Sequence, residues 1–184
     1  EREDRLHVVL LNVEHAAERV DRLGRVGHLL FVDAGDPQQA AGILDNRFYR
    51  NISRESCERA GLEIDPETEK WWEDQSAEAR AALEPDQVSL ASALSDFLKW
   101  WETNNAQFFW SHGANFDEVL VRCAINAVGL DVPWDFWNVR CSRTVLALNN
   151  RKPRRENTTH HHALDDAIAQ AVAVAAALRD GKTY

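Results

Sequence analysis

The sequence contains no methionine and only three cysteines among its 184 residues. Cys57, Cys123 and Cys141 lie far apart and form no CxxC pair, which argues against a disulfide framework and against a thiolate metal site. This cysteine usage favours a reducing environment, and we expect a cytoplasmic protein. Because methionine is missing even at position 1, we expect the chain to begin after a processed segment.

Long apolar runs and an excess of basic residues are also lacking. No window approaches the roughly 20 apolar residues that a membrane-spanning helix requires, and the charged residues Glu1 to Arg5 do not fit a signal peptide. Lysine and arginine number 21 against 30 aspartates and glutamates, for a net charge of −9. This charge argues against a protein that coats nucleic acid nonspecifically, but it permits an enzyme with a local basic patch. We expect no membrane partner.

The sequence does contain enough apolar material for one compact domain over residues 1–184. Apolar residues make up 45% of the chain, and seven of the residues are tryptophans. A chain of this length can bury a sizeable core around a central sheet. We find no internal repeat and no low-complexity linker that would divide it.

The order of apolar patterns predicts an α/β fold. Leu6–Val13 is a nearly continuous apolar run, typical of a strand buried on both faces at the centre of a sheet. Gly27–Val32 and Asn46–Ile52 are predicted to complete an antiparallel meander with it. The later segments are predicted helices at Pro66–Trp72, Ala77–Leu83, Leu90–Glu102, Asn115–Val128 and Ala163–Leu178, a strand at Ala106–Trp110, and a turn at Pro133–Asn138 that leads into Thr144–Leu148. This order predicts a mixed sheet flanked by helices.

Polar side chains end the opening strand. Asn12 and Glu14 are two residues apart, so their side chains point to the same face of the strand. A polar pair at the end of a buried strand is a candidate ligand pair. The alternative is that the strand has reached the surface there and Glu14 is solvated.

A second carboxylate, Asp117, lies at the start of a predicted helix. At 100° per residue it falls within an apolar arc, whereas Glu118 and Arg122 form an i,i+4 pair that we expect on the polar side. The apolar arc comprises Phe116, Leu120, Cys123, Ala124 and Ala127. Asp117 is therefore predicted to face the core, where a carboxylate needs a cation or strong donors. The alternative is an aspartate favoured by the helix dipole.

The third candidate is the segment that runs from His161 to Asp166. Thr158 or Thr159 can cap the following helix, which places His161 at its mouth and the two adjacent aspartates in its first turns. Adjacent helical residues diverge by about 100°, so Asp165 and Asp166 cannot both face one site. Periodicity does not choose between them because the helix is alanine-rich almost all round. The alternative for His160 to His162 is a purification-tag remnant or a zinc-binding tract.

These three segments together resemble the motifs of the DEDDh exonuclease family, which includes ribonuclease T, oligoribonuclease and the proofreading subunit of bacterial DNA polymerase III. The pattern HxALxDA, with the histidine five residues before the aspartate, resembles the third motif and selects His161 and Asp166. Phe116-Asp117 resembles the second motif, and Asn12-x-Glu14 occupies the place of the first, normally Asp-x-Glu.

A narrower branch, the mycobacterial-type 3'–5' exoribonucleases and their phage-borne relatives, is similar over most of the chain. Five further segments carry this likeness: Phe48-Tyr49-Arg50-Asn51-Ile52, Trp71-Trp72 with Gln75-Ser76, Trp110-Ser111-His112-Gly113-Ala114, Trp134-x-Phe136-Trp137-Asn138 and Arg143-Thr144. The resemblance implies a ribonuclease-H-like fold, often a homodimer, and hydrolysis of single-stranded RNA or short single-stranded DNA to nucleoside monophosphates. The aromatic residues have core packing as their alternative role.

The resemblance also implies a role for each site residue. Two Mg²⁺ or Mn²⁺ ions suit such a carboxylate cluster. Glu14 and Asp166 would hold the ion that activates water, Asp117 would serve the second ion, and His161 would be the general base. Asn12 stands where the family has an aspartate that bridges both ions, so we expect weaker metal binding. An engineered substitution and a natural loss of activity both remain open, since His112 and His15 also depart from the branch's usual Asn and Thr.

Four cations in five residues precede His161, and we expect them to bind the nucleic-acid backbone. They are Arg151, Lys152, Arg154 and Arg155, and His112 is a further candidate contact. The alternative is an exposed basic loop without a partner. For the whole chain, the alternatives to an exonuclease are a catalytically inactive nuclease-fold protein that grips a 3' end, and a zinc-binding protein.

Overall fold

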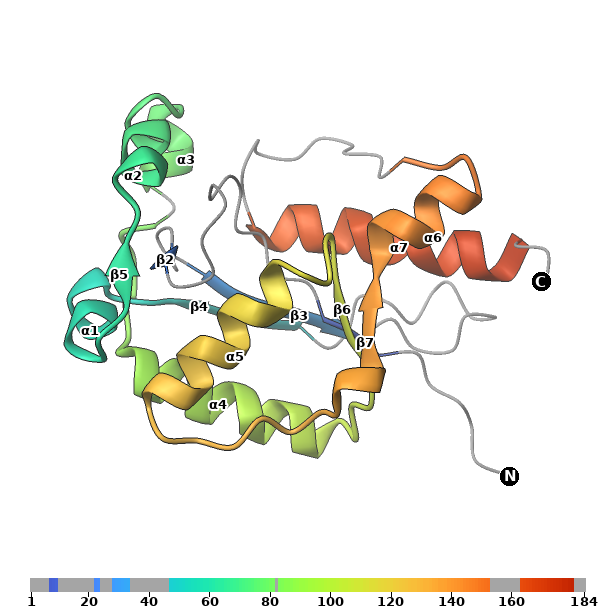
Figure 1. Cartoon of the computed structure of the whole chain (residues 1–184). Coiled ribbons are helices and arrows are strands. Elements are labelled where there is room, and N and C mark those ends of the chain that lie inside the picture. The colour runs from blue at the N-terminus through green and yellow to red at the C-terminus, as the bar shows by residue number, and fades with distance from the viewer. Residues whose placement is uncertain are drawn as a thin grey trace.

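A computed structural model of the chain describes residues 7–9, 22–23, 28–33, 47–81, 83–152 and 163–180. Three strands form an antiparallel sheet in the order β1-β3-β4, in which His7 lies opposite Asp33 and Phe31 lies opposite Phe48. Two later strands, β6 and β7, pair in parallel, and β1 lies beside β6. Strand β1 therefore lies between β3 and β6, in the central position that the sequence predicts. Figure 1 shows β3 beside β4 and β6 beside β7. The strands are β1 (His7–Val9), β3 (His28–Asp33), β4 (Arg47–Asn51), β6 (Phe109–Ser111) and β7 (Val139–Cys141).

Helices surround these strands, and several of them begin at a side-chain cap. Ser53, Asp65 and Ser89 each accept a hydrogen bond from a backbone amide in the first turn of the helix that follows. A short parallel pair, β2 (Arg22–Leu23) and β5 (Glu63–Ile64), is separate from the other strands. The helices are α1 (Arg54–Arg59), α2 (Pro66–Glu73), α3 (Ala77–Ala81), α4 (Leu90–Thr103), α5 (Asp117–Ala127), α6 (Ser142–Leu148) and α7 (Ala163–Asp180), with a 3₁₀ turn at Phe136–Asn138.

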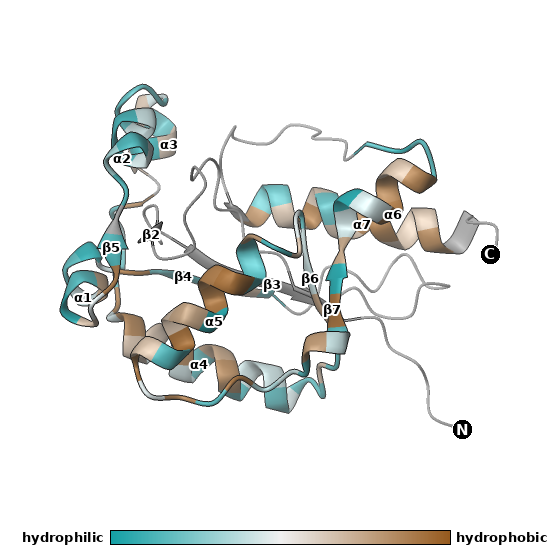
Figure 2. Ribbon diagram, in the orientation of Figure 1, coloured by the Kyte–Doolittle hydropathy of each residue, from teal (hydrophilic) through white to brown (hydrophobic). Residues whose placement is uncertain are grey.

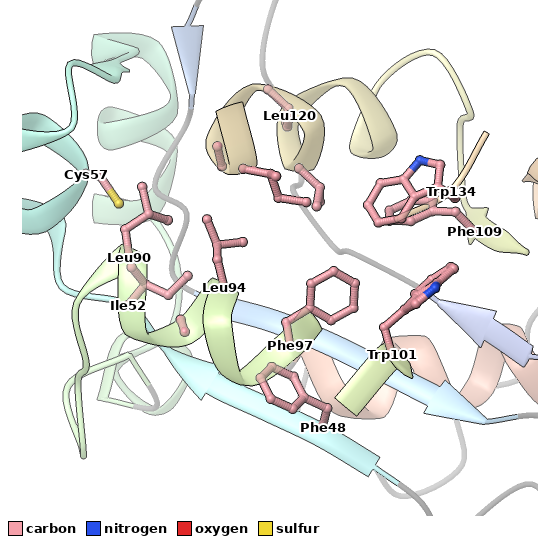
Figure 3. Packing of buried hydrophobic residues seen from close by; sticks show 14 residues of the cluster. Phe48, Ile52, Cys57, Leu90, Leu94, Phe97, Trp101, Phe109, Leu120 and Trp134 are labelled. Carbon is pink, nitrogen blue, oxygen red and sulfur yellow. The ribbon is translucent and has the colours of Figure 1, made fainter. Parts of the chain in front are cut away.

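The strands send alternate side chains into two separate cores, because successive residues of a strand point to opposite faces. On β4, Phe48 joins the cluster that contains α4 and α5, whereas Tyr49 packs against the cluster of α6 and α7. On β6, Phe109 likewise belongs to the first of these clusters and Trp110 to the second. The first cluster is shown in Figure 3. In Figure 2, stretches of α4 and α5 are coloured as hydrophobic, whereas α1 and α2 are coloured mostly as hydrophilic. The sheet thus has a helical layer on each face.

The predicted mixed α/β fold, an antiparallel meander plus parallel strands flanked by helices, is confirmed. Strand β7 and helix α1 were not predicted. Both are short, and β7 places Arg140 between two residues that are only half buried, so no apolar alternation marks it. Strand β6 ends one residue later and α5 begins two residues later than predicted. Within the described ranges, no helix combines the length and apolar character needed to cross a membrane.

Candidate nuclease site

The candidate site lies at the carboxyl ends of β6 and β7. These strands are parallel, and Ser111 at the end of β6 pairs in register with Cys141 at the end of β7. Both strands therefore deliver their next residues, His112 and Ser142, to the same edge of the sheet. In α/β folds this edge is the usual place for a ligand, because the loops that leave the strands converge there.

Asp117 is fixed at this edge by a tight turn that follows β6. Gly113 has a φ of +144°, a conformation that side-chain-bearing residues rarely adopt, and its carbonyl accepts a hydrogen bond from the Phe116 N–H at 2.9 Å. The Asp117 side chain is only 4% exposed, and its Oδ2 accepts a hydrogen bond from the His112 N–H at 3.1 Å. The expectation that Asp117 faces inward is confirmed.

Burial also separates the two adjacent aspartates of α7. Asp166 is 1% exposed, whereas Asp165 is half buried. The sequence pattern alone could not choose between them, and the structure buries the one that the family resemblance selects. Asp117 and Asp166 belong to helices on opposite faces of the sheet, since α5 lines the aromatic core and α7 lines the other.

The remaining predicted site residues divide into two groups. Arg151 and Lys152 follow α6 and, with Asn150, line a groove of about 590 Å³ whose other wall is α7. That wall consists of Ala169, Val172, Ala173 and Ala176. The other predicted residues lie outside the described residues: Asn12, Glu14, His161, Arg154 and Arg155.

The two described carboxylates fit a hard divalent cation. Burying an ionised carboxylate is costly unless a cation or several donors compensate its charge, and Asp117 and Asp166 are both more than nine-tenths buried. Carboxylate oxygens suit Mg²⁺ and Mn²⁺ better than softer metals. Among residues with described placement, no group of three or more His, Cys, Asp or Glu side chains could hold a metal ion. A complete site would need the first-motif residues Asn12 and Glu14.

Sequence reasoning missed the part that α6 has in this site. Ser142 is fully buried, and its Oγ lies 3.0 Å from Nδ1 of His112 and 3.1 Å from the Ser111 carbonyl oxygen, to which it donates. The next residue, Arg143, donates from Nη2 to the His112 carbonyl oxygen at 2.9 Å. The sequence signal was Arg143-Thr144, which carried a family likeness but no assigned contact. Helix α6 therefore holds His112, whose N–H in turn contacts Asp117.

One expectation about α5 was wrong. Glu118 was expected on the polar side of the helix with Arg122, but it is only 6% exposed. The pairing itself is correct, since Arg122 Nε donates to Glu118 Oε1 at 2.8 Å. The same oxygen accepts a second hydrogen bond from Nε1 of the buried Trp134, also at 2.8 Å. Periodicity could not anticipate this burial, because Trp134 arrives from a loop 16 residues later.

The thiol of Cys141 has an unusual environment beside the site. Burial alone would raise the pKa of this thiol, but hydrogen bonds from the Thr144 hydroxyl and from the amides of Ala114, Thr144 and Arg143 outweigh that effect and lower it. Cys57 lies in the aromatic core, where burial raises the pKa of its thiol to about 11.

Comparison with known proteins identifies the family of the chain. The family model described as the 3'–5' exoribonuclease Rv2179c-like domain matches residues 11–178, a span that includes the whole candidate site. Searches of curated proteins and of solved structures gave no match. Since the family model covers well over half of the chain, the protein belongs to the family of 3'–5' exoribonuclease Rv2179c-like domains, which are hydrolytic exonucleases acting on nucleic acid.

Proposed function

We propose that the chain is a two-metal-ion 3'–5' exonuclease of the DEDDh type that removes nucleoside monophosphates from single-stranded RNA or from short single-stranded DNA and 3' overhangs. The observation that carries this proposal is the burial of Asp117 and Asp166, the two described carboxylates that the DEDDh resemblance selects. Buried carboxylates suit cation binding, because a cation offsets the cost of burying their charge. The family membership supports the reaction class.

Each residue then has a definite task. Glu14 and Asp166 would hold one cation and Asp117 the other, while His161 would accept the proton of the attacking water. The His112 N–H fixes the orientation of the Asp117 carboxylate, since it donates to Oδ2. When bound, two Mg²⁺ or Mn²⁺ ions supply neutralisation of charge on the scissile phosphate and on the leaving oxygen.

Asn12 reduces this activity in our proposal. An amide offers one neutral oxygen where the family has a charged, bridging carboxylate, so the site carries one negative charge fewer. We expect metal affinity and turnover to be low in this chain. The same observation favours a second candidate function, a catalytically inactive protein that grips a 3' terminus.

The basic cluster gives the incoming strand a place to bind. Arg151 and Lys152 line the groove beside α7, and the wall of α7 in that groove carries no charged side chain. We propose that these residues, together with Arg154, Arg155 and His112, contact the strand. Neutralising Arg154 and Arg155 should weaken binding of the strand and flatten the salt dependence of that binding. A protein that makes fewer phosphate contacts releases fewer counterions when it binds. An unchanged salt slope would remove the cluster from the proposal.

The deciding experiment restores the missing carboxylate. The Asn12→Asp protein is assayed with Mn²⁺ on matched single-stranded RNA and DNA oligonucleotides and on a 3'-overhang duplex, with release of monophosphates as the readout. We expect clear turnover, and loss of it in the double variant Asn12→Asp/Asp117→Asn. A restored protein as inert as its parent, but still able to bind the 3' end, would favour the binding function instead.

The zinc-binding alternative and the homodimer need separate measurements. A zinc tract at His160 to His162 would give stoichiometric zinc after purification without chelators.

The homodimer and the single domain over residues 1–184 remain predictions, and sedimentation velocity tests the first of them. A cytoplasmic location likewise stays a prediction.

A further inference from the structure

Ser142 is a buried hydroxyl that joins two elements of the candidate site. It is the first residue of α6, it has no solvent exposure, and it lies at the carboxyl edge of the sheet directly after β7. Its Oγ donates to the Ser111 carbonyl oxygen at 3.1 Å and lies 3.0 Å from Nδ1 of His112. A single hydroxyl thus ties α6 both to the end of β6 and to the side chain that follows it.

His112 passes this restraint on to Asp117. Its ring is held by Ser142, its carbonyl oxygen accepts from Arg143 Nη2 at 2.9 Å, and its N–H donates to Asp117 Oδ2 at 3.1 Å. Two consecutive residues of α6 therefore fix the peptide group and the ring of His112.

We infer that Ser142 is a positioning residue, which locks His112 in place and through it orients the Asp117 carboxylate for metal binding. This inference rests on the proposed function, since it assigns Asp117 to a cation. Partners that orient a ligand in this way contribute to metal affinity without touching the metal, because a ligand that must be ordered at binding binds less tightly. Arg143 supports the same peptide from the exposed side.

The test compares two serine-to-alanine variants for Mn²⁺ affinity, measured by electron paramagnetic resonance on the full chain. Ser142→Ala should weaken Mn²⁺ binding by about 10-fold, the lower end of the loss seen when an orienting partner is removed. Ser56→Ala is the matched control. The Ser56 hydroxyl also makes two hydrogen bonds, donating to the Ser53 carbonyl oxygen at 2.7 Å and accepting from the Leu90 N–H at 2.8 Å, but it lies at α1. Its loss should leave Mn²⁺ affinity unchanged.

The possible failures are distinguishable. Because Asn12 is itself expected to weaken metal binding, the comparison is made in the Asn12→Asp background if the parent binds no Mn²⁺. If that form also binds none, both the proposed function and this inference fail. If Mn²⁺ binds and the two serine variants bind it equally well, only the inference fails. Should Ser142→Ala not fold, His112→Ala is measured in the same way. It removes the ring that Ser142 holds but keeps the N–H that donates to Asp117, so weaker Mn²⁺ binding supports the lock and an unchanged Mn²⁺ affinity overturns it.

Discussion

The two cores on either side of the sheet are filled by different kinds of side chain. The core that faces α4 and α5 is rich in large aromatic rings, with Phe97 packed against Phe48, Trp101 and Trp134 at centroid distances between 5.9 and 6.2 Å (Figure 3). The core that faces α7 is built largely from alanine: Ala167, Ala171, Ala175 and Ala177 are almost fully buried there.

This difference shows two ways of attaching a helix to the same sheet. Short side chains allow the backbone of α7 to lie close to β3, so its packing depends on the lack of bulk. The aromatic layer depends on large rings that fill a wider space. Each layer also carries one of the two described carboxylates, Asp117 on α5 and Asp166 on α7. Substitutions that alter bulk should therefore have opposite consequences in the two layers.

The largest expected effect is the removal of the ring at the centre of the aromatic core. Phe97 has no solvent exposure, and Phe97→Ala should lower the free energy of unfolding by about 3–5 kcal/mol, because it leaves a cavity among rings that cannot collapse. Urea denaturation measures the change. A loss below about 1 kcal/mol would show that the aromatic layer is adaptable.

In the alanine layer the damaging change is added bulk. Ala171 has no solvent exposure, so Ala171→Leu should cost about 1–3 kcal/mol by forcing α7 away from the sheet. The matched control is Ala91→Leu on the exposed face of α4, where a similar helix propensity and open space should leave stability within about 0.5 kcal/mol. Equal effects at both positions would contradict the close packing of α7.

A smaller effect should follow from removing one hydrogen bond between α5 and the loop before β7. Trp134→Phe keeps an aromatic ring but removes the donor to the buried Glu118. We expect a loss of about 1–2 kcal/mol, since Arg122 continues to pair with the carboxylate. A double-mutant cycle with Glu118→Ala and Trp134→Phe isolates this contact, and additive effects would mean that it contributes nothing.

The thiols of Cys141 and Cys57 allow the two regions around them to be compared by chemical reactivity, with no change to the stability of the protein. Cys141 has a lowered pKa, whereas the pKa of Cys57 is raised to about 11. Only the thiolate reacts with iodoacetamide, so between pH 7 and 9 Cys141 should be alkylated first, and its rate should level off at a lower pH. Peptide mass spectrometry of a time course measures both rates. Faster modification of Cys57 would contradict the hydrogen bonding at the start of α6.

Much of the fold could be predicted because its signals are local. The apolar run at the opening strand and the capped, periodic segment at α4 specify their elements within a few neighbouring residues. The boundaries of β6 and α5 were less accurate, because the turn at Gly113 ends the strand through contacts rather than through composition. Strand β7 escaped prediction since three residues with a central arginine carry no period.

The candidate site likewise has features that local sequence signals predict and features that depend on long-range contacts. By itself the sequence determined the alternation that sends Phe48 and Tyr49 to opposite faces, and the motif order that singled out Asp117 and Asp166. Only the tertiary structure decided that Asp166 rather than Asp165 is buried, that Glu118 is covered by Trp134, and that Ser142 holds His112. The physical reason is distance along the chain: these contacts join residues 16 and 30 positions apart, and no local pattern encodes which distant segment will cover a given face.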